Sequence, residues 1–160
     1  MKLGRSIAMM AVVGLAVAAC GGKPPAAPMA ASAKNAAWLT DFDAAKKMAA
    51  QKKLPMLAYF SGSDWCEWCV TLDQEVFSQE AFMTYASSNL VLFIADFPER
   101  KEVPKSLQKQ NAVLAEKYNS EGRFPTVLLL DATGGVLGKT GYQPGGPEKY
   151  VESLKAMLKK

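Results

Sequence analysis

Two of the three cysteines stand three residues apart, in the run Trp65-Cys66-Glu67-Trp68-Cys69. This run follows a short apolar stretch typical of a buried strand and begins a stretch with helical spacing. Two cysteines on a first helical turn can close a small disulfide ring. The partial positive charge and the unpaired N–H groups of a helix N-terminus stabilise a thiolate there. We therefore expect Cys66 to attack a substrate disulfide and Cys69 to resolve the mixed disulfide that forms.

Two other interpretations of the cysteine pair remain open. In an exported protein the pair could be a structural staple, although so short a ring constrains the unfolded chain little. The pair could also bind a metal, but the chain has no histidine and only one further cysteine, so we expect no metal site. The absence of histidine also excludes a Ser-His-Asp triad, a Cys-His protease site and haem attachment.

The elements that must position the cysteines can be read from hydrophobic spacing, turn residues and caps. The pattern predicts helices at about residues 41–52, 65–77, 78–87, 104–118 and 147–158, and strands at about 54–60, 90–95, 125–130 and 136–142. The expected helix-starting residues are Asp41, Ser63 or Asp64, Ser78, Pro104 and Pro147. A hairpin at residues 131–135 and a βαβ unit together predict an α/β fold, a mixed four-stranded sheet with helices on both faces.

Six aromatic residues fall at positions that favour the core. They are Trp38, Phe42, Phe77, Phe82, Phe93 and Tyr118. The two tryptophans beside Cys66 are less clearly structural. We expect Trp65 to lie near a substrate groove, whereas the pattern leaves open whether Trp68 faces the groove or the core.

A second segment strengthens the redox interpretation. Phe124-Pro125-Thr126 begins a strand, a hairpin follows near Gly134, and Gly141 ends that hairpin. Together with the Cys66–Cys69 segment, this arrangement resembles the thioredoxin family across residues 37–158. It is most similar to exported thioredoxin-like proteins related to the C-terminal domain of the transmembrane disulfide reductase.

The resemblance implies a thioredoxin-like fold, exchange with protein disulfides and no small-molecule cofactor. It also implies that Pro125 is the cis-proline of the family, packed beside the Cys66–Cys69 pair. The backbone of Phe124 could then pair with an extended substrate segment. A trans proline that merely starts an edge strand is the alternative.

The chain departs from the family in its charges. Thioredoxin has a buried aspartate on the strand before its cysteines, and Tyr59 stands at the aligned position, so no buried carboxylate base is evident. Four acidic residues lie near Cys66 in sequence and no cation does; they are Asp64, Glu67, Asp73 and Glu75. Negative neighbours disfavour a thiolate and favour a stable disulfide, which predicts a reductant or mild isomerase and not a strong oxidant.

The missing base leaves a competing class of function. The chain could be a non-catalytic binding or assembly lipoprotein of the cell envelope that uses the same groove.

The first twenty residues have the anatomy of an export signal. Lys2 and Arg5 precede an apolar run at residues 7–19, and Val17-Ala18-Ala19-Cys20 resembles the lipobox of bacterial lipoproteins. The resemblance implies a signal peptide at residues 1–19, a lipid anchor on Cys20 and a Pro/Ala-rich tether at 20–34. The folded domain would then span residues 35–160. An ordinary secretory signal with an incidental cysteine is the alternative.

These features predict a place and a set of partners. We expect the domain to be anchored in the cell envelope, facing the periplasm. The outer membrane is favoured in a Gram-negative cell, because no aspartate follows Cys20. In an oxidising compartment a reductant must be recharged, so a membrane dithiol reductase is the expected electron donor.

Composition limits the other possibilities. The chain has 160 residues, of which 49% are hydrophobic and 21% charged, which fits one globular domain with appendages and excludes a disordered or multi-pass membrane chain. Although the net charge is +4, the lysines and arginines are scattered, so we expect no nucleic-acid partner.

Overall fold

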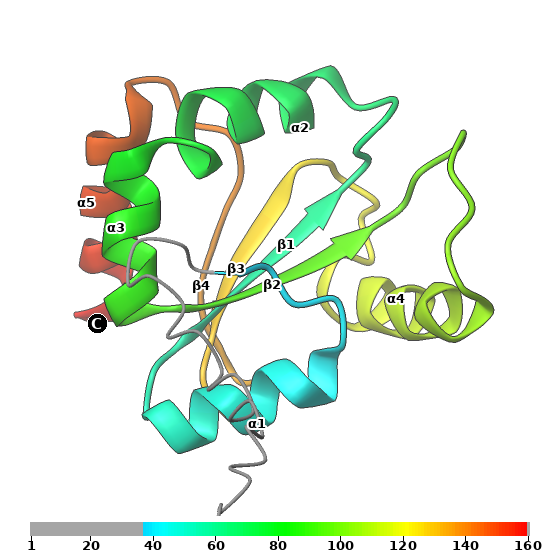
Figure 1. Cartoon of the computed structure of the whole chain (residues 1–160), viewed down its shortest axis with the longest axis horizontal. Coiled ribbons are helices and arrows are strands. Elements are labelled where there is room, and N and C mark those ends of the chain that lie inside the picture. The colour runs from blue at the N-terminus through cyan, green and yellow to red at the C-terminus, as the bar shows by residue number, and fades with distance from the viewer. Residues whose placement is uncertain (1–36, 160) are drawn as a thin grey trace, which may run out of the picture. The chain divides into compact units, whose positions relative to one another are not determined.

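The fold is built on a mixed four-stranded sheet, as expected from the sequence. The structure is a computed structural model that describes residues 37–159. The strands lie in the order β2–β1–β3–β4, with bounds β1 Met56–Ser61, β2 Val91–Asp96, β3 Thr126–Leu130 and β4 Val136–Thr140. Strands β1 and β2 are parallel, whereas β3 is antiparallel to both β1 and β4 (Figure 1).

Helices cover both faces of the sheet, which confirms the expected α/β class. Their bounds are α1 Phe42–Lys52, α2 Glu67–Leu72, the π-helical turn η1 Asp73–Phe77, α3 Glu80–Asn89, α4 Lys105–Tyr118 and α5 Gly146–Leu158. Helices α1 and α4 contribute to one buried cluster, and α2, η1, α3 and α5 contribute to the other.

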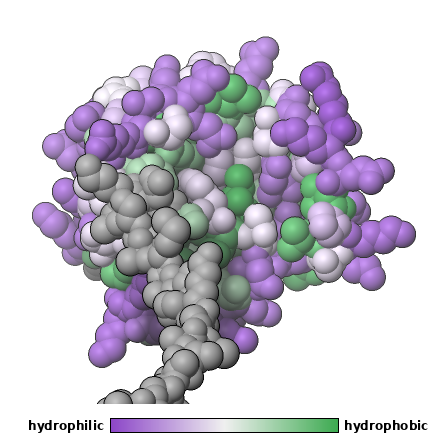
Figure 2. Space-filling view, in the orientation of Figure 1, coloured by the Kyte–Doolittle hydropathy of each residue, from purple (hydrophilic) through white to green (hydrophobic). Residues whose placement is uncertain are grey.

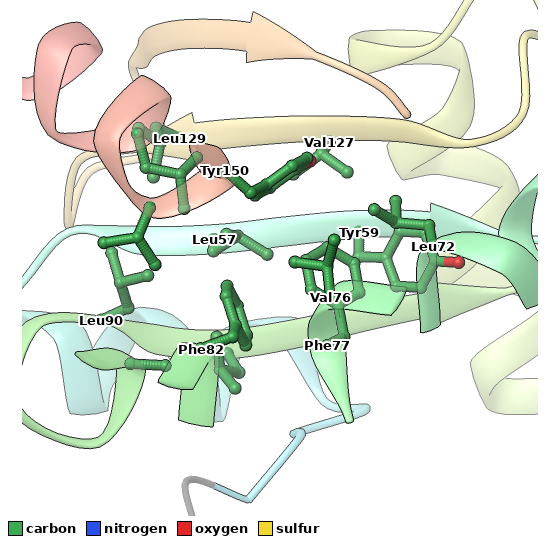
Figure 3. Close-up of a cluster of buried hydrophobic side chains, with 14 of the residues drawn as sticks. Leu57, Tyr59, Leu72, Val76, Phe77, Phe82, Leu90, Val127, Leu129 and Tyr150 are labelled. Carbon is green, nitrogen blue, oxygen red and sulfur yellow. The ribbon is translucent and has the colours of Figure 1, made fainter. Parts of the chain in front are cut away.

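Strand β1 connects the two clusters because its side chains alternate between the faces. Leu57 and Tyr59 enter the cluster beneath α2, α3 and α5, which Figure 3 shows in detail. Met56, Ala58 and Phe60 enter the cluster beneath α1 and α4. All six residues of β1 are buried, which explains why the strand reads as one continuous apolar run.

Some predicted helix starts are confirmed and others are wrong. Asp41 caps α1, where its carboxylate accepts a hydrogen bond from the Ala44 N–H at 2.8 Å. Ser78 does not cap α3; its hydroxyl donates to the Gln74 carbonyl of the preceding turn, and Gln79 stands at the cap. Pro104 lies one residue before α4 begins, and Pro147 lies in the first turn of α5.

The predicted helix over residues 65–77 divides into two parts. An α-helix ends at Leu72, and η1 continues with a wider turn, marked by the bond from the Ser78 N–H to the Asp73 carbonyl at 2.8 Å. The wider turn lets Leu72, Val76 and Phe77 all be buried (Figure 3). Hydrophobic spacing does not separate these two helix types over so few residues.

Four of the six predicted core aromatics are buried: Phe77, Phe82, Phe93 and Tyr118. Trp38 and Phe42 are only half-buried, because the segment before α1 lies along the edge of the sheet. There Leu39 forms a parallel bridge with Phe93 of β2. On the coloured part of the face shown in Figure 2, hydrophilic side chains predominate and the hydrophobic surface forms small separate patches.

The predicted signal peptide, the lipid-anchor Cys20 and the tether lie outside the described residues. Within residues 37–159, no helix combines the length and the apolar character that a membrane crossing would need.

Candidate active site

The cysteine pair lies where β1 ends and α2 begins. A tight loop at residues 62–65 joins the two elements, and the Gly62 carbonyl accepts hydrogen bonds from the N–H groups of both Trp65 and Cys66. Gly62 is required sterically, because a Cβ there would overlap the Trp65 indole. The loop therefore delivers Cys66 to the N-terminus of α2.

Cys66 and Cys69 are joined in a disulfide, with their Cα atoms 5.2 Å apart. Cys66 is itself the N-cap of α2, and its sulfur accepts a hydrogen bond from the Cys69 N–H at 3.2 Å. The expectation that Ser63 or Asp64 caps this helix is therefore wrong. Cys66 is 6% exposed and Cys69 is fully buried, so Cys66 is the more accessible residue of the pair.

Behind Cys69 lies a pair of buried hydroxyl groups. The Tyr59 hydroxyl donates to the Cys69 carbonyl at 3.2 Å, and the Ser61 hydroxyl donates to the Tyr59 oxygen at 3.1 Å. Burial raises the pKa of the Tyr59 phenol well above its usual range. Tyr59 is therefore a neutral hydrogen-bond donor, in the position where the family resemblance led us to look for a carboxylate.

A carboxyl group does lie close to this region, on a residue that the sequence marked only as an acidic neighbour. Asp73 begins η1, four residues after Cys69, and its side chain is half-buried. Burial, followed by the negative charge of Asp96, raises the pKa of Asp73 to about 6. The spacing of four residues from Cys69 was a usable signal, but the burial of Asp73 depends on the wide turn of η1.

The structure changes the charge balance expected around Cys66. Asp64 turns toward the loop after β2, where its carboxylate accepts hydrogen bonds from the Glu99 and Arg100 N–H groups at 2.9 and 2.8 Å. These N–H groups, together with Lys101 and Arg100, lower the pKa of Asp64. The fold therefore brings two cations from far along the chain close to Asp64, which lies two residues before Cys66.

Trp65 forms one aromatic wall of the site. Its indole N–H donates to the Phe97 carbonyl at 2.7 Å, and its ring centroid lies 5.3 Å from that of Phe124. The ring is still 40% exposed. The position of Trp65 thus agrees with a surface that a substrate could touch.

Trp68 lies apart from Trp65 and pairs with Tyr142, with ring centroids 5.0 Å apart. Its side chain is 59% exposed, so Trp68 does not belong to the core. The Tyr142 hydroxyl donates to a Glu75 carboxylate oxygen at 2.8 Å. The sequence marked Glu75 only as an acidic neighbour of Cys66 and gave no signal for Tyr142, because only the fold brings the segment after β4 to η1.

The segment at Pro125 completes the site. The Phe124–Pro125 peptide bond is cis, in agreement with the family resemblance. Both residues are half-buried, and Phe124 packs against the cluster that contains the two cysteines. Gly141 approaches this segment so closely that a Cβ there would lie 2.9 Å from the Pro125 carbonyl oxygen. Among the described residues, no three or more histidine, cysteine, aspartate or glutamate side chains lie close enough together to hold a metal ion.

Comparisons with known proteins support this geometry. The family model described as thioredoxin-like matches residues 37–132. The chain is 32% identical over 128 residues to "Disulfide bond reductase DsbH" of Chlamydia pneumoniae, covering 80% of this chain and 76% of that protein. It is 26% identical over 93 residues to "Thioredoxin-related protein DsbJ" of the same organism, covering 58% of this chain and only 26% of that protein.

Two solved structures support the fold. The structure titled "DsbH Oxidoreductase" aligns with a TM-score of 0.75 and 29% identity, covering 86% of this chain and 94% of that one. A thioredoxin from Thermus thermophilus aligns with a TM-score of 0.55 and 14% identity, covering 76% of this chain and 85% of that one. The second likeness concerns the fold alone.

Proposed function

This chain belongs to the thioredoxin-like family of disulfide oxidoreductases, and from that premise we propose that it reduces protein disulfides outside the cytoplasm. Cys66 is the proposed nucleophile and Cys69 the resolving cysteine. The observation that carries the proposal is the asymmetry of the pair. Cys66 caps a helix and keeps a small exposed fraction, whereas Cys69 is bonded to it from a fully buried position.

The proposed reaction begins with both cysteines reduced. The Cys66 thiolate, stabilised by the helix N-terminus and the Cys69 N–H, attacks one sulfur of a substrate disulfide. The substrate S–S bond breaks, its second sulfur leaves as a thiolate and takes up a proton, and a mixed disulfide forms. Cys69 then loses its proton and attacks the Cys66 sulfur; the bond between Cys66 and the substrate breaks, and the substrate sulfur leaves as a thiolate that takes up a proton. The substrate leaves with two electrons gained, and the Cys66–Cys69 disulfide remains.

Trp65, Phe124 and Pro125 form the proposed binding surface for the substrate. Trp65, which directly precedes Cys66, and Phe124 pack against each other. An extended substrate segment would lie along this surface and pair with the backbone of Phe124.

The proposed direction of electron flow is reduction. Glu67 directly follows Cys66 and is exposed, and Asp73 adds a second carboxyl beyond Cys69. Negative charge near the pair disfavours the thiolate, which stabilises the disulfide and lowers the reduction potential. The DsbH relative is named a disulfide bond reductase, which supports the same direction. We expect a potential well below the strong-oxidant value of about −120 mV.

The proposed location rests on the sequence at Cys20. We propose that the chain is lipid-anchored there, on the periplasmic side of the cell envelope, with the outer membrane favoured in a Gram-negative cell. A reductant in that compartment needs a continuing source of electrons, so a membrane dithiol reductase is its proposed donor. Labelling with a radioactive fatty acid tests the anchor. Wild type should carry the label and Cys20→Ser should not.

The central experiment is reduction of insulin disulfides in the presence of a thiol donor. Wild type should accelerate the reaction, and both Cys66→Ser and Cys69→Ser should abolish the acceleration. Cys69→Ser should also accumulate mixed disulfides with envelope proteins, because the resolving step is lost. Unchanged insulin reduction by Cys66→Ser would refute the assigned nucleophile. Absence of both activity and trapped partners would favour a non-catalytic binding module.

A further inference from the structure

Trp68 and Tyr142 form an exposed aromatic pair that the exchange reaction itself does not use. Trp68 lies between the two cysteines in sequence, yet its indole is 59% exposed. Its ring lies 5.0 Å from Tyr142, inclined by 39°, so neither ring covers the other fully. The pair therefore leaves aromatic surface exposed, on a residue that directly precedes Cys69 in the chain.

The pair is fixed in place before any partner arrives. Tyr142 follows β4 and packs against the buried cluster that contains both cysteines. Its hydroxyl donates to one carboxylate oxygen of Glu75, on η1, at 2.8 Å. Because the ring and the carboxylate hold each other, binding here loses little side-chain entropy.

The charge on this side of the disulfide is negative. Glu67 and Glu75 are exposed, and among residues 37–159 neither forms an ion pair with a lysine or arginine. The opposite side, at Asp64, differs because Arg100 and Lys101 are close to that carboxylate. A substrate segment that passes Trp68 would therefore meet the negative charges of Glu67 and Glu75, which no described lysine or arginine pairs.

We propose that Trp68, Tyr142 and Glu75 form a subsite for a positively charged side chain, arginine or lysine, on the substrate segment that carries the disulfide. The subsite deepens the proposed function and rests on it. A cation placed over the indole face is attracted by the ring electrons. A guanidinium in that position can also donate to the second oxygen of Glu75, while Tyr142 keeps the first.

The test uses disulfide-linked peptides that carry a fluorophore and a quencher. The three peptides differ only at the position two residues from the cysteine, and that position holds arginine, leucine or glutamate. Because a nearby charge alters the reactivity of any disulfide, each rate is divided by the rate with dithiothreitol. Reduced wild type, Glu75→Gln, Trp68→Leu and Glu116→Gln are compared. Glu116 is an exposed glutamate on α4, at the other face of the sheet, and serves as the matched control.

We expect wild type to prefer the arginine peptide over the glutamate peptide by about tenfold, which combines one exposed cation–π contact and one ion pair. Glu75→Gln should reduce that ratio to about threefold, and Trp68→Leu should reduce it similarly. Glu116→Gln should keep the wild-type ratio. The wild-type ratio should also fall between about 0.05 M and about 0.5 M salt, because exposed charges are screened.

Two outcomes would overturn the subsite while leaving the proposed function intact. One is equal normalised rates for the arginine and leucine peptides. The other is a Glu75→Gln ratio equal to that of wild type. A preference for leucine would identify an apolar occupant instead. Failure of the reduced wild type to reduce any of the three peptides would refute the proposed function, and the subsite with it.

Discussion

Two buried hydroxyl groups lie behind Cys69, where thioredoxin carries a carboxylate. The Tyr59 hydroxyl bonds to the Cys69 carbonyl, and Ser61 completes the pair, so both hydroxyls are satisfied within the protein. The same carbonyl accepts a bond from the Asp73 N–H, where α2 gives way to η1. Tyr59 therefore supports the buried cysteine through the backbone of Cys69.

Tyr59→Phe tests this support. The change removes the donor to Cys69 and leaves the Ser61 hydroxyl buried without its acceptor, so the oxidised protein should lose about 1–2 kcal/mol of unfolding free energy. Denaturant unfolding measures the loss. Tyr85→Phe is the matched control, because the Tyr85 hydroxyl has no hydrogen-bond partner among the described residues. Equal losses in the two variants would contradict the assigned role.

Asp73 predicts a pH dependence of stability. The folded protein raises the pKa of Asp73 from 3.8 to about 6, through burial and the charge of Asp96. Between these two pKa values the folded state keeps a proton that the unfolded chain releases. The contribution of Asp73 to the unfolding free energy is therefore greatest below about pH 4 and is lost as the pH rises through about 6. Asp73→Asn removes the dependence.

Relative to wild type, Asp73→Asn should therefore gain stability between about pH 4 and about pH 7. We expect a gain of about 1 kcal/mol, reduced from the full shift because the carboxyl is partly open to solvent. Urea unfolding at several pH values measures the difference, with Asp43→Asn on the exposed side of α1 as control. A difference between Asp73→Asn and wild type that is constant with pH would show that Asp73 does not titrate in this range.

At the scale of elements, the sequence predicts where helices and strands lie more accurately than it predicts the residues at which they begin and end. The apolar runs and the Asp41 cap are local signals, and the helices and strands that they predict are present. The predicted cap of α2 is wrong because both candidate residues bond elsewhere. Ser63 bonds to Asp96 at the end of β2, and Asp64 accepts from the Glu99 and Arg100 N–H groups of the loop after β2. Those partners lie more than thirty residues away, so local cap preferences cannot reveal them.

The junction of β4 with the Pro125 segment gives a prediction at this scale. Gly141→Ala would place a Cβ 2.9 Å from the Pro125 carbonyl oxygen, a backbone atom held by its segment. The φ of Gly141 is not in the left-handed region, so the effect is steric. We expect a loss of about 1–3 kcal/mol in unfolding free energy and slower insulin reduction.

Gly138→Ala on the same strand is the comparison for Gly141→Ala. A Cβ at residue 138 would lie 2.9 Å from the Met157 sulfur, which can rotate aside, and 3.0 Å from the Met157 Cβ, which requires α5 to shift by a few tenths of an ångström. Thermal unfolding should therefore show a smaller loss for Gly138→Ala. A larger loss for Gly138→Ala than for Gly141→Ala would show that the Pro125 segment can yield.

At the scale of the whole molecule, the site is assembled at one end of the sheet. Because β1 and β2 are parallel and β3 is antiparallel to β1, the ends of β1 and β2 and the beginning of β3 lie together (Figure 1). The strand pattern was sufficient to predict this sheet, whereas the expectation that Pro125 lies beside Cys66 came from the family resemblance. The contacts between loops, such as Trp65 with Phe97, depend on loop conformations that carry no periodic signal.

The loop after β2 is tied to the active-site loop mainly through Asp64, which accepts from the Glu99 and Arg100 N–H groups. Asp64→Ala removes both acceptors at once, whereas Trp65 still holds the Phe97 carbonyl. We expect the Glu99 and Arg100 amides to exchange with solvent about tenfold faster, because their opening no longer breaks a hydrogen bond to a carboxylate. Amide hydrogen exchange followed by NMR measures the change, and Asp131→Ala, which frees amides of the distant hairpin, is the matched control. Unchanged exchange at residues 99 and 100 would mean that other contacts, such as the Trp65–Phe97 and Ser63–Asp96 hydrogen bonds, are enough to hold the loop without Asp64.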